Sequence, residues 1–167
     1  MARLGSIKYQ VSQILQKVNG IGTSKKETRE QSGAKSLESG HKVSDKVHSY
    51  KSLENMRNDL TNLANYAKAE FQIKDIKEIN IDIVSSWIES KNISYKTASN
   101  YFSELNKVSD HFNFTKEQIK DLRADLKKDL PKTELETRAY RNLEKIELRP
   151  HTQPAFELQR DYGLRVN

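Results

Sequence analysis

The stretch SYKTASNYFSELNKVSDHF, residues 94–112, decides the fold class of this chain. Its apolar side chains recur at steps of three and four, the spacing that places them on one face of an α-helix. The opposite face carries short hydrogen-bonding groups and cations, with Glu104 as the main acid. The segment therefore predicts a helix with one buried and one polar, basic side. The apolar positions are Ala98, Tyr101, Phe102, Leu105, Val108 and Phe112.

The same periodicity recurs on both sides of this segment. It predicts helices over residues 3–18 and 49–70, and a further helix that begins after the N-cap residue Asn80. Thr115-Lys116-Glu117-Gln118 is a capping box that opens another helix, which Pro131 ends. No stretch shows the alternation of a β-strand. The sequence predicts an all-α fold, a compact helical bundle with extensions at both ends.

Composition shifts divide the chain into five parts. We expect an N-terminal helix over 1–22, a flexible polar linker over 23–46 and the bundle over 47–130. The linker prediction rests on a run rich in Ser, Gly, Lys and Glu with almost no apolar anchors. A highly charged linker follows over 131–152, and the last part, 153–167, contains a short helix and the sequence Gly-Leu-Arg.

Charge and composition narrow the function classes. The net charge of +6 and a pI near 9.4 favour a polyanionic partner. There is no cysteine, and the four histidines are dispersed, so we expect neither a metal site nor a cofactor. No apolar run approaches the roughly 20 residues that span a bilayer, and no signal-peptide core is present. These features predict a cytoplasmic protein without membrane contact.

The spacing of the acidic residues also does not favour a pair of catalytic carboxylates. Asp121, Asp125 and Asp129 recur every four residues, but basic residues, Arg123 among them, lie between them. Such alternation is typical of a solvated helix face. We therefore interpret this face, Arg123 included, as exposed surface.

The basic positions form the candidate binding surface. Lysines near the starts of two helices can neutralise phosphates, while Thr97 and Asn100 are short enough to reach base edges. Ser94 caps its helix and can donate to a phosphate. From these residues alone, a solvated bundle face remains an alternative. The candidate DNA-binding residues are Lys51, Lys91, Ser94, Lys96, Thr97, Asn100 and Lys107.

The order of these pieces resembles the core-binding, SAM-like domain of tyrosine recombinases, the phage-integrase family. The resemblance starts at Ser49-Tyr50-Lys51 and the apolar stripe behind it, and continues through the helix around Trp87. Ser94-Tyr95-Lys96-Thr97 then resembles a helix start of that domain. Near the C-terminus, FELQRDYGLR, residues 156–165, resembles the first box of the family's catalytic domain.

The resemblance implies a DNA-binding part of a recombinase that grips duplex DNA during integration or excision of a mobile element. It implies that Arg165 holds the scissile phosphate, and that double-stranded DNA, with no small-molecule substrate, is the partner. The family's tyrosine nucleophile and most of its catalytic residues have no counterpart in these 167 residues. We therefore expect no strand cleavage by this chain; assembly into a homo-oligomer on DNA stays open.

Two alternative functions, each from a different class of protein, remain. The first is a helical protein-interaction module that dimerises through the N-terminal stripe from Leu4 to Val18. The second is a small helix-turn-helix regulator, for which Lys91-Asn92-Ile93 is a connection of suitable length.

Overall fold

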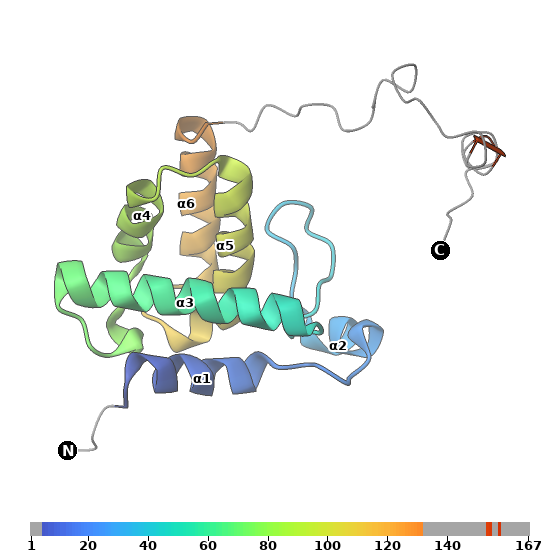
Figure 1. Cartoon of the computed structure of the whole chain (residues 1–167), viewed down its shortest axis with the longest axis horizontal. Helices are drawn as coiled ribbons and strands as arrows, with labels where there is room; N and C mark the ends of the chain where they lie inside the picture. Colours follow the sequence, from blue (N-terminus) through green and yellow to red (C-terminus); the bar gives the residue numbers. More distant parts are fainter. Residues whose placement is uncertain (1–4, 132–152, 155–156, 158–167) are drawn as a thin grey trace. The chain divides into compact units, whose positions relative to one another are not determined.

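The computed structural model describes residues 5–131, 153–154 and 157 (Figure 1). The fold is all-α, as predicted, and the described residues contain no strand. Two single turns of 3-10 helix, η1 (Ile76–Glu78) and η2 (Ser109–His111), join longer helices. The α-helices are α1 (Ile7–Val18), α2 (Lys25–Ser32), α3 (Tyr50–Phe71), α4 (Ile81–Ser90), α5 (Tyr95–Val108) and α6 (Lys116–Asp129).

All six helices belong to one compact unit. A second unit contains the described residues beyond Pro131, where Gln153 Nε2 donates to Glu157 Oε1 at 3.2 Å. The predictions for the linker 131–152 and for Arg165 lie outside the described residues.

Polar caps fix where the helices begin. At each N-cap a side-chain oxygen accepts a backbone N–H of the first turn, which satisfies a donor that has no partner within the helix. The predicted capping box at Thr115 is present, with Gln118 Oε1 accepting from the Thr115 N–H at 2.8 Å. The N-cap residues are Ser6, Ser24, Ser49, Asn80, Ser94 and Thr115.

The core lies between α3, α4, α5 and α6. Trp87, predicted to be buried, is 3% exposed and packs on the Tyr101 ring at 4.9 Å between centroids. The remaining large core side chains come mainly from the predicted apolar stripes of the same helices. They include Met56, Leu60, Leu63, Ile88, Phe102, Leu105, Ile119 and Leu126.

The N-terminal helix is part of this bundle, which differs from the predicted boundary at residue 47. α1 packs along α3, and its stripe of Val11, Ile14, Leu15 and Val18 is buried in the common core. On the polar side, Gln10 accepts from the Ile76 N–H at 3.0 Å. Since the stripe already has an intramolecular partner, it is not available for the dimer considered above.

The segment 23–46 also differs from prediction, because it is folded onto the bundle. It contains α2, and the loop after α2 turns back with an antiparallel bridge between Lys35 and Lys42. Ser44 is 3% exposed, and its Oγ lies 2.8 Å from His48 Nε2. Leu37 packs against the core. Polar contacts do most of the anchoring of this segment. A search for apolar anchors in the sequence therefore could not detect that the segment is folded onto the bundle.

We predict that Leu15→Ala lowers the free energy of unfolding of the whole bundle by about 2–4 kcal/mol, because it leaves a cavity between α1 and its neighbours. Urea unfolding followed by circular dichroism measures this. Gln16→Ala, on the exposed side of the same helix, is the control and should change the value by less than about 0.5 kcal/mol. Equal stability of both variants would contradict the packing of α1.

Candidate nucleic-acid interface

A groove of about 830 Å³ lies among α2, the segment that follows it, α3 and α5. Side chains from all four contribute, so the groove depends on the folded state of segment 23–46. Most of its lining residues are polar or charged, and cations outnumber acids among them. The cations are Lys25, Arg29, Lys42, Lys46 and Lys107, and the acids are Asp59 and Glu104. Uncharged polar groups come from Ser52, Asn55, Asn58, Thr97, Asn100 and Ser103.

Lys107 holds one wall of this groove in place. Its ammonium donates to the carbonyl oxygen of Ser44 and, at 3.4 Å, to that of Lys46. Burial lowers the pKa of Lys107, and the nearby Lys25 acts in the same direction, while Asp45 opposes the shift. Lys107 was predicted to bind phosphate as an exposed side chain, but most of its donor capacity is used within the protein.

Lys46 has a comparable internal role at the other end of the wall. Its ammonium donates to the carbonyl oxygen of Lys17 in the last turn of α1, at 2.6 Å. A cation there complements the unpaired carbonyls and the negative end of the helix dipole. Lys25, Arg29 and Lys42 are exposed, so their charged ends are accessible to solvent.

Both residues predicted to reach base edges, Thr97 and Asn100, line the groove. Asn100 is exposed on α5, and Thr97 lies one turn before it. The hydroxyl of Thr97 is 3.3 Å from that of Ser94, which caps α5 by accepting the Thr97 N–H at 3.4 Å. Ser94 is therefore a cap, as predicted, and it does not line the groove.

The remaining predicted residues lie outside the groove. Lys91 places its ammonium 4.9 Å from the Trp87 ring centroid and 5.8 Å from that of Tyr101, in cation–π contacts. Lys51 is exposed and pairs with Glu54 at 3.0 Å. Lys96 is exposed on α5.

The sequence analysis missed the exposed groove cations Lys25, Arg29 and Lys42 of the 23–46 segment. A signal was present, because Ser24-Lys25-Lys26-Glu27 has the spacing of a capping box and opens α2. In the structure, Ser24 Oγ accepts the Glu27 N–H at 3.4 Å. Recognising that helix start would have placed Lys25 and Arg29 one turn apart on an ordered helix.

Two acids lie on the inner side of the groove, next to the core. Asp59 of α3 and Glu104 of α5 also line a small cavity bounded by Leu63 and Trp87. Burial, with the charge of Asp59, raises the pKa of Glu104 to about 8. Burial also raises the pKa of Asp59, although its interaction with Glu104 and the charge of Lys91 oppose the shift. Burial of the pair therefore favours the protonated form of Glu104.

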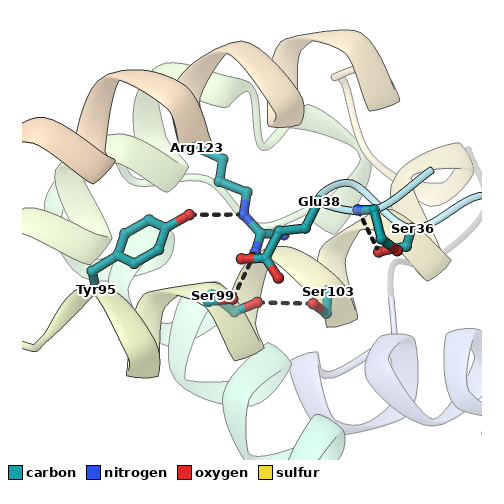
Figure 2. Close-up of polar contacts among 7 residues, drawn as sticks. Ser36, Glu38, Tyr95, Ser99, Ser103 and Arg123 are labelled. Atoms are coloured by element: carbon teal, nitrogen blue, oxygen red, sulfur yellow. Dashed lines mark hydrogen bonds and ion pairs between the residues drawn. The ribbon is translucent and has the colours of Figure 1, made fainter. Parts of the chain in front are cut away.

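A buried arginine on α6 supports the loop beside the groove, as Figure 2 shows. Arg123 is 6% exposed; its Nε donates to Tyr95 Oη at 3.1 Å and its Nη2 to Ser99 Oγ at 2.8 Å. Its Nη2 also forms an ion pair with Glu38 in the loop after α2. This corrects the expectation that Arg123 belongs to a solvated face.

The neighbouring aspartates are exposed, as predicted. Within the part of the chain that the structure describes, no helix is long and apolar enough to cross a membrane. The same residues contain no group of three or more metal-binding side chains. No protein-family model, curated protein or solved structure matches this chain.

We predict that Arg123→Met releases the loop over residues 34–43, because Glu38, Tyr95 and Ser99 lose their shared partner. Hydrogen exchange should accelerate at the amides of Ser36 and Val43, which donate to His41 and Ala34 carbonyls. The free energy of unfolding should fall by about 1–3 kcal/mol.

Lys127→Met, an exposed change on the same helix, is the control for this experiment. It should leave both exchange and stability unchanged. Unaltered exchange over residues 34–43 in Arg123→Met would show that the arginine does not anchor the loop.

Proposed function

We propose that this chain is the DNA-binding N-terminal part of a tyrosine recombinase, which grips duplex DNA during integration or excision of a mobile element. The observation that carries the proposal is the cation-lined groove, with Thr97 and Asn100 on its α5 side. The family itself is proposed from the sequence motifs quoted above. The groove adds a surface with the charge and side-chain chemistry that such a role requires.

The electrostatics of the groove favour a polyanion. Three exposed cations, Lys25, Arg29 and Lys42, face the opening, and two more lie in its wall. The groove also has two acids, Asp59 and Glu104, and burial favours the protonated form of Glu104. Lysine and arginine side chains that neutralise phosphates release condensed counterions, which supplies a sequence-independent, salt-sensitive part of DNA affinity.

The amide side chains supply the groups for sequence preference. Asn55 and Asn58 on α3 and Asn100 on α5 line the groove, together with the hydroxyl of Thr97. Asparagine can pair with adenine through two hydrogen bonds, and a threonine hydroxyl can contact several base edges. In this proposal the cations position the duplex, while these side chains discriminate between bases.

Lys51 and Lys96 are exposed near the starts of α3 and α5 and extend the basic surface beyond the groove. The proposed role of Arg165 at a scissile phosphate concerns a residue outside the described part of the chain. The expected lack of strand cleavage by this chain, the homo-oligomer on DNA and the cytoplasmic location also stay predictions from the sequence.

The helix-turn-helix alternative is less well supported. A recognition helix needs its N-terminal turn free to contact base edges. Here the Tyr95 side of the first turn of α5 is covered, because the Tyr95 N–H donates to the Pro131 carbonyl at 3.1 Å and its hydroxyl accepts from Arg123, while the Thr97 side lines the groove.

We predict that the chain binds a labelled duplex of about 30 base pairs in fluorescence anisotropy. Three phosphate contacts would lower the affinity roughly 40-fold between about 50 and 200 mM salt. The variant Lys25→Glu/Lys42→Glu should bind at least about tenfold more weakly and reduce the salt slope by about two.

The matched control is Lys120→Glu/Lys127→Glu, which makes the same change in net charge on α6, away from the groove lining. It should weaken binding much less than the groove variant. An absence of binding at low salt, or equal losses in both variants, would overturn the proposal. Lys107 is unsuitable for this test because its loss would also release the groove wall.

A further inference from the structure

Two carboxyl groups occupy an unexpected place in a groove that fits a polyanion. Asp59 and Glu104 line it on the side next to the core, and the exposed cations of α2 and the following loop line it as well. Glu104 Oε2 is buried and has no hydrogen-bond partner in the described part of the chain. A carboxylate in that position would be unsolvated at one oxygen and would face a second carboxylate.

A proton held by one of the two carboxyl groups would remove the repulsion between them. Two neighbouring carboxylates in a poorly solvated site cannot both remain charged at low cost, so one of them retains a proton. A protonated Glu104 can donate to Asp59, which gives the buried side chain a partner. The pair then carries one negative charge, and loss of the proton doubles it.

We propose that this carboxyl pair couples DNA binding to protonation: the groove holds DNA while Asp59 and Glu104 share a proton and releases it more readily once that proton is lost. The inference rests on the proposed function, because it names a regulation of the same groove. Its physical basis is the second negative charge that would then face the phosphates.

Other charged groups around the pair modify this behaviour without replacing it. Lys91, at the end of α4, lowers the pKa of Asp59 and so favours Asp59 as the charged member. Burial raises the pKa of Tyr101, as do both acids, so its hydroxyl stays neutral. The basic groups facing the groove are Lys25, Arg29, Lys42, Lys46 and Lys107.

The test needs a control for the titration of Lys107. Burial lowers its pKa, so loss of its proton at high pH would also weaken DNA binding. Asp45 raises the pKa of the same ammonium and faces it from the loop. A variant that changes Glu104 alone retains this contribution, so the difference from the parent chain isolates the carboxyl pair.

The test is the affinity of the full chain for a 30-base-pair duplex between pH 6.5 and 9.5 at constant ionic strength. From the parent chain we expect a loss of roughly three- to tenfold across the titration of Glu104, beyond the loss seen in Glu104→Gln. The amide resembles the protonated acid in shape and charge, so it should remove this component.

Two further variants sharpen the result. Asp59→Asn removes the partner charge and should shift the pH-dependent loss to lower pH. Glu117→Gln removes an exposed acid from the first turn of α6 and should retain the parent profile. Parallel profiles for the parent chain and Glu104→Gln, with binding intact, would overturn the inference and leave the proposed function standing.

A measurement without DNA tests the shared proton directly. Because folding raises the pKa of Glu104 from 4.5 to about 8, the native state binds more protons between these values. The stability of the parent chain relative to Glu104→Gln should therefore fall as pH rises through this window and level off above it. A flat difference would refute the shared proton, and absence of duplex binding at every pH would overturn both proposals.

Discussion

The ammonium of Lys107 donates to two backbone carbonyls, those of Ser44 and Lys46, and this contact fixes a polar segment against α5. The segment has few apolar side chains of its own, so buried polar contacts must replace hydrophobic anchoring. Thr28, Ser44 and His48 form a second set of hydrogen bonds at the same place. The groove needs this wall, because α2 and the loop supply its exposed cations.

A second anchor acts at the far end of the loop. Arg123 reaches from α6 between Tyr95 and Ser99 and pairs with Glu38 (Figure 2). The buried end of this ion pair has several hydrogen-bond partners, which offsets the cost of removing a guanidinium from water. The charges of Lys107 and Arg123 thus hold the groove in shape, while Lys25, Arg29 and Lys42 are exposed at it.

Hydrophobic periodicity and cap residues were sufficient to predict α3, α4, α5 and α6, and the burial of Trp87. They could not predict the fold of segment 23–46, because a hydrogen bond from a distant lysine to a carbonyl leaves no periodic pattern. Lys107 lies on the polar side of α5, and a helical wheel cannot tell whether such a side is solvated or covered by another polar segment.

The sequence position of Arg123 did indicate burial, but its charged surroundings favoured the opposite interpretation. It follows Ile119 by four residues and precedes Leu126 by three, so it shares the inward stripe of α6. Its charge and the neighbouring aspartates favoured a solvated interpretation instead. Glu104 is similar, since it lies between Tyr101 and Leu105 at the border of the buried face. At this site, hydrophobic periodicity therefore fails to predict the burial of charged residues that lie on or beside an apolar stripe.

The central claim is that segment 23–46 is a fixed wall of the bundle. The chain has no cysteine, so nitroxide labels can be attached at Ser39→Cys and Arg57→Cys without background. Double electron–electron resonance between them should give one narrow distance distribution, as narrow as that of a reference pair at Arg57→Cys and Lys120→Cys. A broad distribution for the first pair, with the reference pair still narrow, would mean that the segment is a tether and that the groove does not persist.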